Sequence, residues 1–315
     1  MQYGDLVSVI VPVFNRAHLL GRTVGSVCSQ SYKNIEILIV DDCSTDAIEE
    51  AVAALGDARV RLIKRARNGG VAAARNTGVD EAKGALVAFF DSDDICVFDR
   101  IERQVRLLLA QPSDYIGVYC ARLFYNDVEE SNYFRTDCHI RPYPHETPLS
   151  GDISHRTMQG NIINFPGLLV RRTALLAAGP SDELLRNNVD WDLCLRLTQQ
   201  GKFAFEPEPL ILTPTALRAE VIAQRISRSS RYKTFSYVRI TGKLRRRKAD
   251  PKILAGHHAT AGRVLISQGY PERARRFFRA SIKNEPLSLK MWGHFLLSYF
   301  PGLHATIRNR RSKKP

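Results

Sequence analysis

The first 125 residues alternate between short apolar runs and longer amphipathic segments. Apolar runs of strand length occupy 7–14, 35–40, 59–63, 85–90 and 115–123. Apolar residues recur at helical spacing in the intervening segments, 17–30, 47–56, 71–82 and 99–111. Strands that alternate with helices form parallel βαβ units. We therefore predict an α/β fold with a Rossmann-like, mainly parallel central sheet.

Beyond this region the pattern becomes irregular. Residues 126–160 are polar, contain three prolines and show little periodicity, which predicts a long loop. Strand character returns at 162–172, and a helix should follow to Ala178. A further helix should begin near Asp190 and turn its leucines inward. An aspartate at that position is either a helix cap or a rigidly held base.

Carboxylates follow two of the apolar runs directly. Asp91-Ser92-Asp93-Asp94 ends the run at 85–90, and Asp41-Asp42 ends the run at 35–40. Open α/β sheets present ligand-binding groups at the carboxyl ends of their strands. Clustered carboxylates repel one another, and a divalent cation that also binds a diphosphate is the simplest way to balance them. The alternative for 91–94 is an acidic turn that caps a helix starting near Phe98.

Two smaller features are open to more than one interpretation. Asp46 could cap the helix predicted at 47–56. Gly69-Gly70 could let a helix N-terminus approach a phosphate, or could form a plain turn. The chain contains neither G-x-G-x-x-G nor G-x-x-x-x-G-K-[ST], so a dinucleotide-binding motif and a P-loop are both unsupported.

Charge is distributed unevenly along the 315 residues. The net charge of +14 combines −6 over residues 1–217 with +20 over residues 218–315. This asymmetry suggests a polyanionic partner, either nucleic acid or an anionic membrane surface. The six cysteines form no C-x-x-C pair, which argues against a zinc site and favours a reducing compartment. We see no signal peptide and no spanning segment, and expect a cytoplasmic location.

The basic region divides into two expected parts. Residues 218–250 should form a basic helical linker, which binds nucleic acid or anionic lipid or is simply solvated. Residues 251–315 should form a helical extension, in which 256–287 resembles one tetratricopeptide repeat. The apolar, aromatic segment 289–300 suits an interfacial helix or a helix that docks on the repeat.

Four motifs in order give the most specific signal. They are VSVIVPVFNR, IEILIVDDCSTD, NGGVAAARNTGVDEAKGALVAFFDSDD and VDWDLCLRL. Together they resemble the family-2 glycosyltransferases with the GT-A fold, of the type that builds bacterial cell-surface polysaccharides and lipopolysaccharide. The resemblance spans about residues 6–215 and implies a catalytic domain over 1–217. One departure is Val189, where the family usually has a glutamate before the aspartate that corresponds to Asp190.

The resemblance also implies roles for individual residues. It places the donor nucleotide against Pro12, Phe14, Asn15, Asp42, Arg75, Asp91 and Ser92. It implies that Asp42 accepts the ring N–H of the base, and that Asp93 or Asp94 binds Mg²⁺ or Mn²⁺. Asp190 would be the general base, with Trp191 and Asp192 near the acceptor. From the residues alone, Arg75 could equally form an ion pair and Trp191 could be a core aromatic.

The expected activity is inverting transfer of a sugar from a nucleotide diphosphate sugar, with UDP favoured. The acceptor would be a hydroxyl of a glycan or lipid-linked molecule, reached from the inner face of a membrane, and nucleic acid is not an expected partner. Two rivals remain: a nucleotidyltransferase, and a polyanion- or membrane-binding protein on an inactive transferase fold. The first would usually carry a glycine-rich first loop, where this chain has Pro12-Val-Phe-Asn-Arg16. Acceptor specificity should lie in 126–165 and around 185–192.

Overall fold

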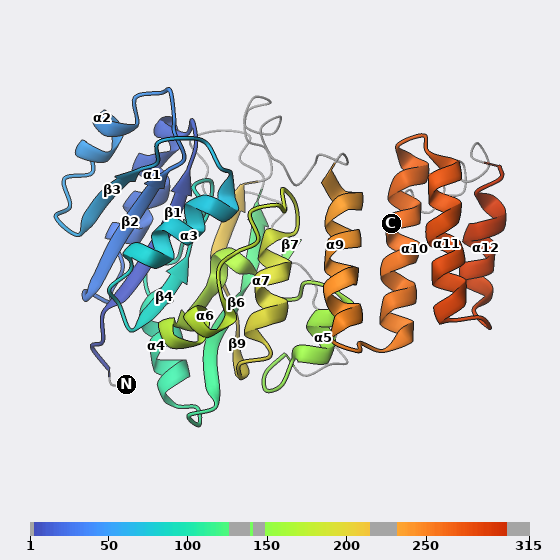
Figure 1. The fold of residues 1–315 in the computed structure, drawn as a ribbon. Helices are drawn as coiled ribbons and strands as arrows, with labels where there is room; N and C mark the ends of the chain where they lie inside the picture. The colour runs from blue at the N-terminus through green and yellow to red at the C-terminus, as the bar shows by residue number, and fades with distance from the viewer. Residues whose placement is uncertain (1–2, 126–138, 141–148, 215–231, 301–315) are drawn as a thin grey trace. The chain divides into compact units, whose positions relative to one another are not determined.

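The computed structural model describes residues 3–125, 139–140, 149–214 and 232–300. The chain divides into two compact units (Figure 1). The first comprises Met1–Leu184 with Val189–Gln224, and the second comprises Leu185–Asn188 with Arg225–Pro315. The predicted boundary at residue 217 lies outside the described residues, so the division into catalytic domain, linker and extension stays a prediction.

The first unit begins with four parallel strands, as the sequence pattern predicts. Their order in the sheet is β3-β2-β1-β4. The strands are β1 (Val7–Val13), β2 (Ile35–Asp41), β3 (Val60–Lys64) and β4 (Leu86–Phe89). Three helices connect them, namely α1 (Ala17–Cys28), α2 (Ile48–Ala53) and α3 (Val71–Glu81). The strand ends that carry the predicted site residues therefore meet at one edge of the sheet.

The second half of the sheet is mixed and was predicted less completely. It continues in the order β8-β6-β9-β5, with β7 paired to β6. These strands are β5 (Ile95–Cys96), β6 (Tyr115–Tyr125), β7 (His139–Ile140), β8 (Leu168–Arg171) and β9 (Lys202–Pro214). The β6–β9 pair is parallel, whereas β8 pairs antiparallel with both β4 and β6. The pattern missed β9 because Glu206-Pro-Glu-Pro interrupts its alternation, where the pairing with β6 shifts register.

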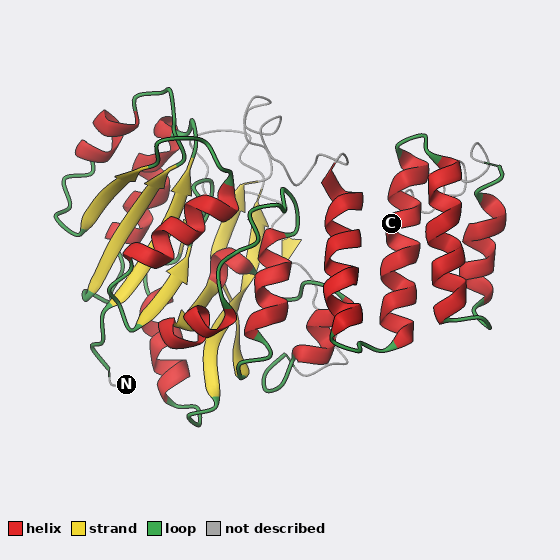
Figure 2. Cartoon of the chain, viewed as in Figure 1, coloured by secondary structure: helices red, strands yellow, loops and turns green. Residues whose placement is uncertain are grey.

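Helices cover both faces of this sheet (Figure 2). Alternate residues of β1 separate the two cores: Val9 and Val11 pack with α1, α2 and α4 (Arg100–Leu109), whereas Ile10 packs on the opposite side. The opposite core contains residues of α3, α6 (Arg172–Ala178) and α7 (Val189–Leu197). A short helix, α5 (Ser154–Gln159), lies within the segment predicted as a loop, and the 3-10 turn Phe165–Gly167 precedes β8. All four β4 residues are buried, as predicted.

The second unit contains four described helices. They are α9 (Lys233–Arg246), α10 (Pro251–Ser267), α11 (Pro271–Asn284) and α12 (Leu289–Leu297). Asp250 caps α10 by accepting a hydrogen bond from the Lys252 amide at 2.8 Å. Gly262 lets α10 approach α11, because a Cβ there would lie 2.6 Å from the Phe278 ring. The predicted helical extension is thus confirmed. Within the described residues we find no helix that is both long and apolar enough to cross a bilayer.

Candidate active site

The loop after β2 holds Asp42 in a fixed position. The Asp42 amide donates to the Val13 carbonyl at 2.9 Å, which joins the ends of β1 and β2. Its buried carboxylate accepts hydrogen bonds from the Gly69 amide at 3.0 Å and the Gly70 amide at 2.6 Å, and it forms an ion pair with Arg65. The glycine amides therefore bind Asp42 in this structure. Gly70 has a φ of +84°, which favours glycine.

The loops after β1 and β2 are tied together. The Asn15 amide donates to the Ser44 hydroxyl at 2.9 Å, and the Asn15 side-chain oxygen accepts from the Thr45 amide at 2.8 Å. Asp46 accepts from the Ala17 amide at 2.7 Å, so it caps α1. The prediction that Asp46 caps the next helix was wrong, because the fold brings the N-terminus of α1 within its reach.

The acidic loop after β4 is balanced by arginines. Each carboxylate faces one guanidinium: Asp91–Arg75 at 3.1 Å, Asp93–Arg16 at 3.3 Å and Asp94–Arg122 at 2.9 Å. Charge balance in this structure therefore does not require a cation. The residue that precedes α4 is Asp99, so the three carboxylates at 91–94 do not cap that helix. The alternative interpretation as a helix-capping turn was therefore wrong.

Asp94 is the most enclosed of the three. Its second oxygen accepts a hydrogen bond from the Thr213 hydroxyl at 2.7 Å. Burial raises the pKa of Asp94, Arg122 opposes this rise, and the neighbouring Asp91 and Asp93 add to it. The resulting pKa is about 7. The exposed side-chain fractions are 34% for Asp91, 12% for Asp93 and 2% for Asp94. Asp91 and Asp93 are therefore more accessible to a ligand than Asp94.

Arg75 contacts the acidic loop and an aromatic ring, and its charge acts on a thiol of α7. The Arg75 guanidinium pairs with Asp91 and stacks 4.3 Å from the centre of the Phe165 ring. Burial raises the pKa of the Cys194 thiol well above its usual value; Asp190 raises it further and Arg75 lowers it. Both charges therefore act on the same thiol.

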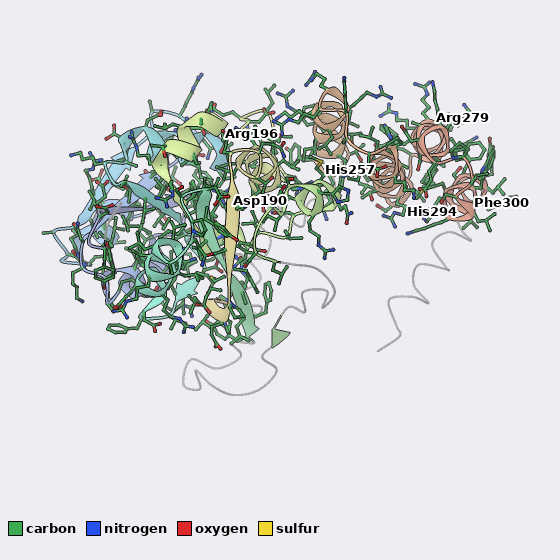
Figure 3. All side chains as sticks on the ribbon, turned by 90° about the horizontal axis from the view of Figure 1, so that it is seen from below. Asp190, Arg196, His257, Arg279, His294 and Phe300 are labelled. Atoms are coloured by element: carbon green, nitrogen blue, oxygen red, sulfur yellow. The ribbon has the colours of Figure 1, made fainter. Side chains whose placement is uncertain are left out.

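Asp190 lies in the first turn of α7 and Arg196 in its last turn, and Figure 3 labels both residues. The Asp190 carboxylate is partly exposed and accepts a hydrogen bond from the side-chain amide of Asn161 at 2.9 Å. A partly exposed carboxylate held in this way keeps acceptor capacity for a proton. The geometry is compatible with a base, and the role stays a prediction.

The two residues that follow are enclosed. Only 4% of Trp191 is exposed, and its indole N–H donates to the Thr157 carbonyl at 2.7 Å. Asp192 is buried and forms an ion pair with Arg196 at 3.2 Å. The placement of Trp191 is that of a core aromatic, which was the structural alternative, and the acceptor roles of both residues stay predictions.

One comparison decides the family. The family model described as Glycosyl transferase family 2 matches residues 8–174, more than half of the chain. The chain belongs to glycosyltransferase family 2. Its sheet and covering helices match the GT-A fold of the structures to which it is similar. The resemblance stated from the four motifs is confirmed.

Individual relatives agree with this assignment. An uncharacterized glycosyltransferase of Rickettsia typhi is 30% identical over 214 residues, covering 66% of this chain and 64% of that protein. The Escherichia coli UDP-Glc:alpha-D-GlcNAc-diphosphoundecaprenol beta-1,3-glucosyltransferase WfgD is 38% identical over 104 residues, covering 33% of this chain and 41% of that protein. The chain thus matches less than two thirds of the length of these curated relatives.

Solved structures extend the likeness in fold. Staphylococcus aureus TarS 1-349 in complex with UDP-GlcNAc has a TM-score of 0.60 at 16% identity, covering 93% of this chain and 79% of that chain. Mannosyltransferase PcManGT from Pyrobaculum calidifontis, in complex with GDP-Man and Mn²⁺, has a TM-score of 0.56 at 18% identity. It covers 98% of this chain and 88% of that chain.

Sequence reasoning gave no role to three arginines that the structure places at this candidate site. Arg16 also donates to the Ser92 hydroxyl at 3.1 Å, Arg65 pairs with Asp42, and Arg122 pairs with Asp94. The sequence could have indicated Arg122, because it is a lone charge inside the buried apolar run that forms β6. Arg16 and Arg65 lie in polar loops, where an arginine is ordinary and carries no such signal.

Proposed function

We propose that this glycosyltransferase transfers a sugar from a nucleotide diphosphate sugar, with UDP favoured, to a hydroxyl of a glycan or lipid-linked acceptor, with inversion at the anomeric carbon. The observation that carries the proposal is the fixed Asp42 carboxylate at the same sheet edge as the Asp91–Asp94 loop. The printed names support the choice of ligands. TarS binds UDP-GlcNAc, and the E. coli relative uses a UDP-sugar and a diphosphoundecaprenol acceptor.

The nucleotide base would bind at Asp42. Two backbone amides and Arg65 hold this carboxylate, so it meets the base without reorganising. A carboxylate accepts a ring N–H, which uracil and guanine both offer, beside the backbone of Pro12 and Phe14. Asn15 would line the same loop, which Ser44 and Thr45 hold in place.

The diphosphate would bind between the acidic loop and its arginines. Arg16 and Arg75 offer positive charge there, and Ser92 offers a hydroxyl. Within the described part of the chain, no group of three or more His, Cys, Asp or Glu residues is arranged to hold a metal. Asp93 and Asp94 are nevertheless hard oxygen ligands that fit Mg²⁺ or Mn²⁺, and Asp93 is the more accessible of the two. When bound, such an ion would neutralise the leaving diphosphate.

Asp190 would act as the general base. The acceptor hydroxyl gives its proton to Asp190 while its oxygen attacks the anomeric carbon from the face opposite the diphosphate. The bond between the sugar and the diphosphate oxygen breaks, and the electron pair leaves with the nucleoside diphosphate. Attack from the opposite face inverts the configuration at that carbon.

We place the enzyme in the cytoplasm, at the inner face of a cell membrane, in the synthesis of a cell-envelope polysaccharide. The +20 charge of residues 218–315 supports attraction to anionic lipids. A lipid-linked acceptor, such as the one printed in the name of the E. coli relative, would be reached from this surface.

The test is thermal stability against a panel of nucleoside diphosphates and UDP- and GDP-sugars, with and without Mn²⁺. A ligand that binds the folded state raises the midpoint. We expect a metal-dependent shift with UDP that Asp93→Ala abolishes. Asp190→Asn should keep this shift and lose sugar transfer to water or acceptor, whereas the control Glu208→Gln, at an exposed acid, should keep both.

The rival proposals predict other outcomes. A protein that shifts with no nucleotide, or whose biological function survives Asp190→Asn, would be a binding protein on an inactive transferase fold. Release of pyrophosphate from a nucleoside triphosphate would reveal a nucleotidyltransferase. Membership of glycosyltransferase family 2 favours sugar transfer over both.

A further inference from the structure

Helix α12 presents two different faces. Its inner side packs on α10 and α11: Met291 is buried, His294 stacks on Phe278 at 5.7 Å, and Phe295 packs against the cluster formed by Leu265, Ala274 and Phe278. These contacts account for the folding of the helix into the unit. They involve only one side of α12.

The outer side carries an apolar stripe, defined as Leu289, Trp292, Leu296 and Tyr299. The first three recur at i, i+3 and i+7, which places them on one face of the helix, and Tyr299 follows in the turn after its last residue. Leu289 is 87% exposed, Leu296 58% and Trp292 42%. Leu287 and Phe300, at the two ends of the stripe, are also exposed. Side chains of this size gathered on one exposed face mark an interaction surface.

Arginines border the apolar stripe on the side of α11. The Arg275 guanidinium lies 4.5 Å from the centre of the Tyr299 ring, and that of Arg279 lies 5.6 Å from the centre of the Phe295 ring. Figure 3 labels Arg279, His294 and Phe300 in this part of the helical unit. Helix α11 contains five basic residues and one acidic residue. The surface therefore combines large apolar side chains with fixed positive charge.

The geometry points to an anionic lipid bilayer as the occupant of this surface: the apolar stripe enters the headgroup region while Arg275 and Arg279 contact lipid phosphates. The inference rests on the proposed membrane association and names the surface that makes it. Exposed tryptophan and leucine beside arginine is the composition of helices that lie in a membrane interface. A second copy of this chain is a poorer fit, because pairing the same face would bring like charges together.

The test uses the full chain and two kinds of vesicle: phosphatidylcholine alone, and an equimolar mixture with phosphatidylglycerol. We expect strong binding to the mixture and weak binding to phosphatidylcholine. Trp292 is one of two tryptophans, and the other, Trp191, is buried. Its emission should therefore shift to shorter wavelength when the mixed vesicles are added.

Matched variants separate the contribution of the apolar stripe from that of other exposed leucines and arginines. Leu289→Ser with Leu296→Ser should lower the partition coefficient at least tenfold. The control pair, Leu176→Ser with Leu184→Ser, removes two leucines that are 50% and 64% exposed in the first unit and should change nothing. Arg275→Gln with Arg279→Gln should lower binding about tenfold, whereas Arg61→Gln with Arg106→Gln, partly exposed arginines of the first unit, should not.

Several results would overturn the inference. Binding of mixed vesicles by the Leu289→Ser, Leu296→Ser protein at the wild-type level would assign the binding elsewhere. An unchanged Trp292 emission on binding would do the same. The basic residues of 301–315 are present in every variant, so they cannot account for a loss. A dimer that the leucine pair abolishes, in a protein that ignores vesicles, would show that a second copy covers the stripe. The UDP-dependent thermal shift, measured on the same proteins, reports the donor site separately.

Discussion

Gly78 lies at a close contact between helix α3 and the central sheet. An added Cβ would lie 2.5 Å from the Cγ2 atom of Ile10, which is fully buried in β1. Helix α3 begins after Gly70, whose amide holds Asp42, and it carries Arg75. Gly78→Ala therefore tests how much the close packing of α3 on β1 contributes to stability.

Two opposing effects decide whether Gly78→Ala raises or lowers the free energy of unfolding. Alanine in a helix interior is about 1 kcal/mol more favourable than glycine. Overpacking a filled core usually costs about 1–3 kcal/mol. Because Ile10 is central in the sheet and enclosed, the steric cost should win, and Gly78→Ala should lose about 0.5–2 kcal/mol of unfolding free energy. That corresponds to a fall of roughly 1–8 °C in melting temperature for a unit of this size.

Gly25 provides the matched control. It lies in helix α1, and a Cβ there would meet nothing within 4 Å. Gly25→Ala should therefore raise the melting temperature by about 2 °C. Thermal unfolding can be followed by the fluorescence of Trp191 in a Trp292→Phe background, which limits the signal to the first unit.

The refuting result is a Gly78→Ala protein that is stabilised as much as Gly25→Ala. The contact with Ile10 can also be tested directly, because Ile10→Leu removes Cγ2. Combined with Gly78→Ala, it should recover at least about 0.5 kcal/mol relative to the sum of the single effects. Strict additivity would mean that the helix shifts away without cost, and the geometric argument would fail.

Two further predictions concern hydrogen-bond partners at the site. Asn161→Ala should lower kcat for sugar transfer by about 10- to 100-fold, since a hydrogen bond to a charged group is worth about 1.5–3 kcal/mol. The UDP-dependent thermal shift should persist in this variant. An unchanged kcat would show that Asn161 does not position Asp190. Arg65→Met should weaken UDP binding about tenfold by leaving Asp42 without its cation, as calorimetry would show. The exposed Arg67→Met is its control, and equal losses in both variants would point to general charge rather than the pairing.

Apart from the two-residue strand β5, the order of helices and strands in the first 125 residues followed from the sequence, because helix and strand periodicities are local properties of the chain. The four motifs also marked the carboxylates at the strand ends, since each lies beside the run that becomes its strand. Strand β9 was not predicted because two prolines interrupt its alternation. Only its pairing with β6 along its length makes it a strand.

The tertiary structure alone decided the partners of the charged groups. Arg16 reaches Ser92 across 76 positions, and Thr213 reaches Asp94 across 119. Neither pairing has a local pattern, because packing of the sheet and loops creates it. The same holds for the outer face of α12: the sequence shows an apolar, aromatic segment, and only the fold determines which of its side chains are covered. Sequence thus determined which chemical groups are present, and the fold determined which of them face each other.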